Sequence, residues 1–253
     1  MTPRAPRIQL REYRRTTTRE DAEVHVLFDA ARLDAPPAEA FDAGAAARHA
    51  DRPAGGRGST VFTVVEGIPA ALRPYRRGGI LGEWLQDRYL RVPVSSTRPW
   101  REATLLAELH EEGLPVPAPL AAQVVVGSMI YRGTLITERL TGTETLGMRM
   151  QRAALDQEQW RRIGAAIGAL HRRGVDHADL NAHNILLGED GQVWIIDLDR
   201  ARVRKPREAW QRRNLQRLER SCIKLAGIAD RAGEPFHPLE GADLEALLEG
   251  WAG

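Results

Sequence analysis

Five polar side chains suited to acid–base or metal chemistry fall within residues 177–184 of the segment HADLNAHNILLGEDGQVWIIDLD. They are His177, Asp179, Asn181, His183 and Asn184, and two carboxylates, Asp197 and Asp199, follow a short apolar stretch. Polar groups packed this densely beside apolar runs cost free energy to bury unless they have partners or a ligand. This segment is therefore the first candidate for a functional site.

The turn GEDG at residues 188–191 is predicted to join two short strands, ILL and QVWII. Antiparallel pairing brings Asn184 and Asp197 to the same end of this hairpin, and Asp179 lies in the loop that leads into it. An Asp and an Asn are oxygen ligands of the kind that suit Mg²⁺, and the third carboxylate suits a general base. No Glu-x-x-His pair or Cys cluster supports zinc instead.

The elements that must position these groups differ between the two halves of the chain. Apolar runs and turn residues predict strands at 22–30, 60–65, 69–75, 122–126 and 133–138, with one helix at 100–112. The second half is helical: Asp156 is placed to cap a helix that ends at Gly174, and further helices are predicted at 207–226 and 239–251. The boundary falls near residues 138–142, so the sequence predicts an α+β fold.

The spacing of the polar residues resembles the protein-kinase-like superfamily. Its catalytic loop reads D-x-x-x-x-N and is followed by a metal-binding Asp, as Asp179, Asn184 and Asp197 are here. His177 matches the His of the H-R-D triplet, and Ala178 replaces its Arg. The resemblance implies a bilobal fold, with an N-lobe at 1–138 and a C-lobe at 139–253. It also implies ATP and Mg²⁺ as cofactors, with Asp179 orienting the acceptor hydroxyl and Asn184 and Asp197 holding the metal.

The first half offers nucleotide-binding residues by the same resemblance. Gly55, Gly56 and Gly58 precede a strand, as the Gly-rich loop over ATP phosphates does, although a plain turn has the same composition. Glu138-Arg139-Leu140 resembles the hinge that binds adenine through its backbone, which assigns Glu138 and Leu140 to the nucleotide.

Arg73 stands where this superfamily has its ATP-binding Lys. Glu102 occupies the position of the acidic partner on the following helix, and Glu108 is the competing candidate. Arg is a permanent forked cation that can bridge phosphate and carboxylate. A nucleotide-binding scaffold without catalysis is the alternative, but Asp179 and both metal-ligand positions are intact.

Only 56 residues follow Asp197, too few for the helical lobe of a protein kinase. Residues 72–90, 177–187 and 214–221 closely resemble the lipopolysaccharide-core kinase family, in particular its 3-deoxy-D-manno-octulosonic acid (Kdo) kinases. The resemblance implies ATP-dependent phosphorylation of the 4-hydroxyl of Kdo on a lipid A precursor, by a peripheral protein at the cytoplasmic side of the inner membrane. Heptose kinases of the family share the catalytic pattern and remain an alternative.

Charge is unevenly distributed along the chain. Residues 200–224 carry ten basic and two acidic groups, whereas residues 230–253 carry six acids and Arg231. Such a basic segment favours an anionic partner, and Arg76, Arg77, Arg213 and Arg217 are candidates for the acidic acceptor. Nucleic acid is disfavoured because no aromatic cluster for base stacking accompanies the charge. Contact with an anionic membrane is expected, and the sequence does not indicate an oligomeric state.

No run of apolar residues is long enough to cross a bilayer, and the basic N-terminus lacks the apolar core of a secretory signal. The single cysteine, Cys222, rules out an intramolecular disulfide and a Cys-based zinc site. These features make the cytoplasm the expected compartment.

Overall fold

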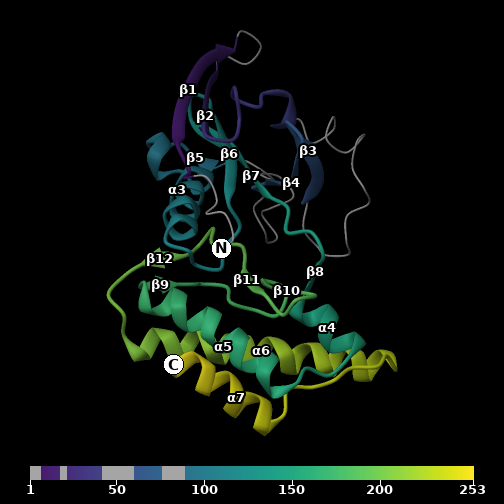
Figure 1. Cartoon of the computed structure of the whole chain (residues 1–253). Coiled ribbons are helices and arrows are strands. Elements are labelled where there is room, and N and C mark those ends of the chain that lie inside the picture. The colour runs from purple at the N-terminus through teal and green to yellow at the C-terminus, as the bar shows by residue number, and fades with distance from the viewer. Residues whose placement is uncertain (1–6, 18–21, 42–59, 76–88) are drawn as a thin grey trace. The chain divides into compact units, whose positions relative to one another are not determined.

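A computed structural model describes residues 7–17, 22–41, 60–75 and 89–253. The chain divides into two compact units, which are labelled by element in Figure 1. Unit 1 comprises Met1–Glu112 and Pro117–Arg139, and unit 2 comprises Gly113–Val116 and Leu140–Gly253. The predicted glycines of the Gly-rich loop, Gly55, Gly56 and Gly58, and the predicted acceptor residues Arg76 and Arg77 lie outside the described residues.

Unit 1 is built on an antiparallel sheet, in which seven strands fall within the described residues. They are β1 (Leu10–Thr17), β2 (Ala22–Asp29), β3 (Val61–Val65), β4 (Ile68–Pro74), β5 (Tyr89–Leu90), β6 (Pro119–Val126) and β7 (Ile130–Glu138). The order is β1-β2-β6-β7-β4-β3, and β5 also pairs with β7. β1 was not predicted, because an edge strand exposes charged side chains that hide the apolar alternation.

A two-residue turn fixes the register of the β3–β4 hairpin. Val65 pairs with Ile68, and Glu66 and Gly67 between them have φ angles of 47° and 81°. Positive φ at both central positions matches the right-handed twist of the strands, and Gly adopts it without strain. This hairpin sets the position of Arg73 near the end of β4.

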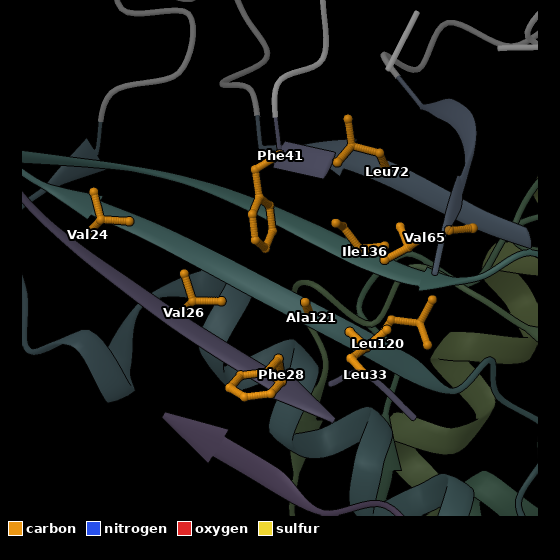
Figure 2. Close-up of a cluster of buried hydrophobic side chains, with 11 residues drawn as sticks. Val24, Val26, Phe28, Leu33, Phe41, Val65, Leu72, Leu120, Ala121 and Ile136 are labelled. Carbon is orange, nitrogen blue, oxygen red and sulfur yellow. The ribbon is translucent and has the colours of Figure 1, made fainter. Parts of the chain in front are cut away.

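The core of unit 1 lies between one face of the sheet and the segment after β2. Val24, Val26 and Phe28 alternate along β2, and Leu72, Leu120 and Ile136 follow from β4, β6 and β7. Leu33 and Phe41 cover these residues, Phe41 at the end of the short 3₁₀ helix Glu39–Phe41 (Figure 2).

Helix α3 (Arg98–Glu111) contacts β6 and β7 in unit 1. It follows a second 3₁₀ helix, Val94–Ser96, and begins with Pro99 in its first turn, where the missing N–H is tolerated. Gly113, with φ of 77°, follows its C-cap, as the sequence predicts. Glu102 lies on the buried face of α3 and is 3% exposed, whereas Glu108 is exposed.

Unit 2 contains α-helices α4 to α7 and the predicted polar hairpin. Its elements are β8 (Thr143–Thr145), α4 (Leu146–Arg152), α5 (Gln157–Arg172), β9 (Val175–Asp176), β10 (Ile185–Gly188), β11 (Val193–Ile195), β12 (Arg202–Val203), α6 (Glu208–Ala232) and α7 (Gly241–Ala252). The β10–β11 hairpin lies on one side of the layer formed by α5, α6 and α7 (Figure 1). The predicted capping of α5 is confirmed: the Asp156 carboxylate accepts from the backbone N–H of Gln159, and Gly174 after the helix has a φ of 88°.

Helix α6 is longer than predicted and ends at Gly233, which has φ of 67°, because no Gly in a left-handed conformation or Pro interrupts it earlier. Short α4, capped by Thr145, was not predicted, since seven residues give little periodicity. Within the described residues no helix is both long and apolar enough to span a bilayer.

Glycines allow α5 and α7 to approach closely. A Cβ at Gly164 would lie 2.0 Å from the carbonyl oxygen of Leu247, and one at Gly250 would lie 2.0 Å from that of Arg161. Real Cβ atoms do not approach backbone oxygens so closely, so both positions require Gly. The contact places Trp251 of α7 beside His171 at the end of α5.

Candidate active site

The β10–β11 hairpin brings Asn184 and Asp197 to one end. Ile185 pairs with Ile195, and the Ile196 N–H donates to the Asn184 carbonyl at 3.0 Å. Asp197 follows one residue later and therefore lies at the same end as Asn184. The sequence-based expectation for the hairpin thus describes where the structure places these residues.

Asp197 has a left-handed backbone, with φ of 64°. A residue with a side chain rarely adopts this conformation, although Asp tolerates it better than most. Such outliers persist only where the surroundings enforce them, and they gather at functional sites. Asp197 lies two residues after the end of β11, so its left-handed backbone changes the direction of the chain directly after that strand.

Asn184 is tied to the loop that contains Asp179. Its Nδ2 donates to the Asp179 carbonyl at 2.9 Å, and its backbone N–H donates to the Asn181 carbonyl at 3.0 Å. Within the described residues, neither the Asn184 Oδ1 nor the Asp179 carboxylate has a hydrogen-bond partner. Asn184 is 9% exposed and Asp179 is exposed, so the carboxylate faces solvent.

His177 connects this loop to the strand before Asp197. The Asp179 N–H donates to its Nδ1 at 3.2 Å, so Nε2 carries the proton and donates to the Ile196 carbonyl at 3.0 Å. Burial lowers the pKa of His177 below its usual value, which favours this neutral form. The imidazole therefore fixes the spacing between the backbone at Asp179 and the backbone at Ile196, the residue before Asp197.

Asn214 of α6 holds the start of the loop. Its Oδ1 accepts from the His177 N–H at 2.9 Å and from His171 Nε2 at 3.3 Å, and its Nδ2 donates to Asp176 at 2.9 Å. His171 Nδ1 accepts from the Trp251 indole N–H at 2.8 Å, which requires the proton on Nε2. Burial lowers the pKa of His171 to about 4, consistent with a neutral ring.

Sequence reasoning missed Asn214, His171 and Trp251 as supports of the loop. One signal was available for Asn214, because an Asn in the same helical stripe as Trp210 and Leu218 is costly to bury without partners. No comparable signal marks His171 or Trp251, which meet only through the packing of α5 against α7.

In unit 1 the structure places Arg73 against Glu102. The guanidinium forms an ion pair with the buried carboxylate, and the Tyr75 hydroxyl donates to the same group. Tyr75 also receives the Arg73 guanidinium over its ring, 5.2 Å from the centroid. The Arg73 side chain is 26% exposed. Tyr75 was not predicted as part of this cluster.

The predicted hinge residues have different backbone environments. The Glu138 N–H donates to the Ala118 carbonyl, and the Glu138 carboxylate accepts from Arg32 at 2.9 Å. The Arg139 N–H donates to the Pro69 carbonyl, whereas the Leu140 N–H has no acceptor among the described residues. Leu140 therefore has the backbone donor available to a ligand.

Arg213 and Arg217 lie on α6. Arg213 is exposed and Arg217 is partly buried. Arg217 falls between Asn214 and Ser221 on the helix, and Ser221 Oγ accepts from the Ala182 N–H at 3.2 Å. Both neighbours of Arg217 thus contact the loop at residues 177–182, which places Arg217 next to it.

Residues 46–251 match the lipopolysaccharide kinase (Kdo/WaaP) family. The chain belongs to this family. Three relatives named 3-deoxy-D-manno-octulosonic acid kinase illustrate the similarity. A Xylella fastidiosa (strain 9a5c) protein is 46% identical over 173 residues, covering 68% of this chain and 69% of the relative. A Stenotrophomonas maltophilia (strain R551-3) protein is 42% identical over 205 residues, which cover 80% of this chain and 81% of the relative. A Vibrio vulnificus (strain YJ016) protein is 38% identical over 196 residues, which cover 78% of this chain and 80% of the relative.

The donor atoms of the hairpin suit Mg²⁺ bound together with a nucleotide. Mg²⁺ usually takes one or two protein oxygens and completes its shell with water and phosphate oxygens. Asp197 and Asn184 Oδ1 supply two such oxygens in this Kdo/WaaP family member. Within the described residues no group of three or more His, Cys, Asp and Glu side chains is arranged for a metal, as a site dedicated to a cation alone would need.

Proposed function

We propose that the protein is a Kdo kinase that uses ATP to phosphorylate the 4-hydroxyl of Kdo on a lipid A precursor. The proposal rests chiefly on one observation: in a chain of the lipopolysaccharide kinase family, Asn184 and Asp197 meet at one hairpin end, beside a loop that exposes the Asp179 carboxylate. The names of the relatives support Kdo as the acceptor sugar.

Asp179 is proposed to accept a hydrogen bond from the attacking hydroxyl and to take its proton as transfer proceeds. Its solvent-facing carboxylate has no competing partner within the described residues. Asn184 and Asp197 are proposed to bind Mg²⁺, which when bound neutralises charge on the nucleotide phosphates. Phosphoryl transfer depends mainly on positioning and on charge, so the rigid His177 bridge between loop and strand contributes directly.

Arg73 is proposed to contact the α- and β-phosphates of ATP. Glu102 and Tyr75 contact its guanidinium, and 26% of the side chain is exposed, so this forked cation is within reach of a phosphate oxyanion. Gly55, Gly56 and Gly58 are proposed to cover the phosphates. The Leu140 N–H next to Glu138 is proposed to donate to the adenine ring.

Arg217 is proposed to bind the Kdo carboxylate, since it lies beside the catalytic loop, with Arg213, Arg76 and Arg77 as further partners for acceptor anions. Heptose has no carboxylate, so this assignment favours Kdo over heptose. The protein is proposed to act at the cytoplasmic side of the inner membrane, in peripheral contact with anionic lipid.

The decisive experiment incubates the purified protein with Mg-ATP and Kdo-lipid A and measures the product mass. Addition of one phosphate, placed on the 4-hydroxyl by NMR, is the expected result. A parallel assay offers heptose-extended acceptor at the same concentration. Preference for heptose would keep the kinase assignment and overturn Kdo as acceptor. ATP binding without transfer to either acceptor would instead indicate a non-catalytic nucleotide-binding protein.

A further inference from the structure

Helix α6 presents a basic face next to the catalytic loop. Arg213, Arg217, Arg220 and Lys224 are spaced four, three and four residues apart, which places them on one side of the helix. We call these four residues the α6 basic stripe. Three of them are exposed, and Arg217 is partly buried.

The cations of the α6 basic stripe make no ion pair within the described part of the chain. Other exposed arginines of unit 2 do have acidic partners, such as Arg161 with Glu249 at 3.0 Å and Arg162 with Glu158 at 3.1 Å. Like charges three or four residues apart on a helix repel one another and destabilise it. An external anion would relieve this repulsion.

Large apolar side chains flank the stripe. Ile223 and Ile228 on α6 are 62% and 43% exposed. Met148 on α4 is 42% exposed, and it adjoins Gly147, where a Cβ would lie 3.0 Å from Leu225 of α6. Exposed apolar side chains on α6 and on the neighbouring α4, together with cations that have no ion pair among the described residues, give the composition of a surface that inserts shallowly into anionic lipid.

The same face is fixed to the catalytic loop. Ser221 accepts from the Ala182 N–H and Asn214 accepts from the His177 N–H, so α6 is attached to the loop on both sides of Arg217. A surface held by the stripe would therefore lie at a constant distance from Asp179. This arrangement suits an acceptor that is itself anchored in the surface.

We propose that the α6 basic stripe, with Ile223, Ile228 and Met148, docks unit 2 on a bilayer of anionic phospholipid. The inference rests on the proposed function, because it explains how a lipid-anchored sugar reaches Asp179. Two classes of group cooperate: Arg220 and Lys224 bind headgroup phosphates, next to the acceptor-binding Arg213 and Arg217, and the apolar side chains enter the boundary between headgroups and acyl chains. Contact with the membrane is thereby assigned to one defined face of α6 rather than to the overall positive charge of the protein.

Co-sedimentation of the full chain with phosphatidylcholine vesicles, with and without phosphatidylglycerol, tests the proposal. The vesicles contain no Kdo, so the result does not depend on catalysis. Binding should require the anionic lipid and should fall as salt rises. Arg220→Gln/Lys224→Gln should lower the partition coefficient about 30-fold, since each cation at an anionic surface contributes about 1 kcal/mol. Ile223→Ser/Ile228→Ser should weaken binding at every salt concentration.

A matched control removes the same charge from paired positions. Arg161→Gln/Arg212→Gln changes two exposed arginines of unit 2 that have acidic partners, and vesicle binding should stay within about twofold of wild type because paired surface charges contribute little. Equal losses in both double variants, or unchanged binding of Arg220→Gln/Lys224→Gln, would overturn the proposal. Release by inorganic phosphate at constant ionic strength would also overturn it, in favour of a site for free phosphate.

Two further results separate the possibilities. Retardation of RNA that depends on Arg220 and Lys224, without vesicle binding, would replace the bilayer by nucleic acid as partner. If wild type fails to phosphorylate Kdo-lipid A while the vesicle results follow expectation, the proposed function fails and the docking surface stands. If transfer occurs but vesicle binding ignores the stripe, only the docking surface fails.

Discussion

Asp179, Asn184 and Asp197 lie at the same end of the hairpin but have different proposed roles. Their substitutions should therefore affect nucleotide binding and phosphoryl transfer to different extents. Asp179→Asn keeps the shape but loses the carboxylate, and we expect nucleotide affinity to persist while transfer falls by about 10²-fold or more. Asp197→Asn removes the charged ligand that we propose for Mg²⁺ and should weaken Mg-ATP binding itself. Asn184→Ala should fall between them, with partial recovery at higher Mg²⁺. Calorimetric titration of Mg-ATP and single-turnover transfer measure the two effects.

The control for this series is Asp199→Asn, a neighbouring carboxylate to which no catalytic role is assigned. Its effect on single-turnover transfer should be the smallest of the series. If Asp179→Asn loses nucleotide affinity in parallel with transfer, Asp179 belongs to the nucleotide site and its role as base is wrong.

Arg73 has a structural and a proposed functional role that can be separated. Arg73→Ala removes a cationic partner of the buried Glu102 carboxylate, which should destabilise unit 1 by up to about 3–5 kcal/mol. Arg73→Lys keeps the charge but not the fork and should retain part of the ATP affinity. Chemical denaturation and nucleotide titration report the two roles. An Ala variant with wild-type ATP affinity would remove Arg73 from the nucleotide site.

At the residue scale, the sequence predicts only those contacts that are made between residues close together along the chain. Asn184 and Asp197 are joined by one tight hairpin, so counting residues from the turn is enough to place them together. Trp251 and His171 are 80 positions apart and meet through the packing of α5 against α7. Nothing local to either residue encodes that contact, and the same is true of the Tyr75 hydroxyl on Glu102.

The last helix of the sequence, α7, affects the loop at residues 177–184 through one hydrogen bond. Trp251→Phe keeps an aromatic ring but removes the indole N–H that donates to His171 Nδ1. The imidazole then keeps only its Nε2–H bond to Asn214 Oδ1, which weakens the hold of Asn214 on His177. We expect kcat to fall by roughly tenfold with KM for ATP unchanged, because small misplacements of reacting groups are costly. The chemical shift of His171 Nδ1 reports the loss of this hydrogen bond directly.

Trp210→Phe is the matched control for this prediction. It also loses an indole hydrogen bond, but to the Lys205 carbonyl, and it also has an edge contact with His171. Both variants should lose similar stability, whereas only Trp251→Phe should lower kcat. Equal losses of kcat would reduce Trp251 to ordinary packing.

The close contact between α5 and α7 leads to a second prediction at the scale of elements, which concerns stability. Gly164→Ala should lower the stability of unit 2 by at least about 1–3 kcal/mol, because the new methyl meets the Leu247 carbonyl oxygen. Gly227→Ala on α6 meets only the Arg231 guanidinium at 3.5 Å and should add up to about 1 kcal/mol through helix propensity. Urea unfolding measures both. Stabilisation by both alanines would mean that the two helices are not held this closely.

Long elements with clear ends were predictable, and short or edge elements were not. The Asp156 cap and Gly174 determine α5 locally, so its limits follow from the sequence. Helix α4 spans one to two turns, too few for an apolar stripe, and β1 lies at the sheet edge, where both charge and apolar groups are tolerated. Periodicity carries no information in those cases, because tertiary contacts decide them.

For the molecule as a whole, acid should destabilise unit 2. In the unfolded chain His171 binds a proton below about pH 6.5, whereas in the folded chain its pKa is about 4. Its contribution is therefore fully present above pH 6.5 and is lost as pH falls toward 4, by on the order of 3 kcal/mol. His177, whose pKa is also lowered by burial, acts in the same direction. Urea unfolding at pH 7.5, 5.5 and 4.5 should show the decline.

His171→Gln isolates this effect from the titration of carboxylates. Glutamine retains a side-chain amide that can donate to Asn214, but it does not titrate. The variant should lose less stability than wild type between pH 7.5 and 4.5. Parallel pH profiles for the two proteins would show that His171 does not cause the decline.

The four residues 113–116 belong to unit 2 although unit 1 sequence surrounds them. Their Pro115 carbonyl accepts the Ile195 N–H at 2.8 Å, so they complete the edge of the strand that leads to Asp197. Unit 2 is therefore not encoded by a single continuous segment. A recombination event that exchanges only residues 140–253 between relatives leaves Pro115, a backbone partner of that strand, with the other parent. A crossover upstream of residue 113 transfers the strand and this partner together.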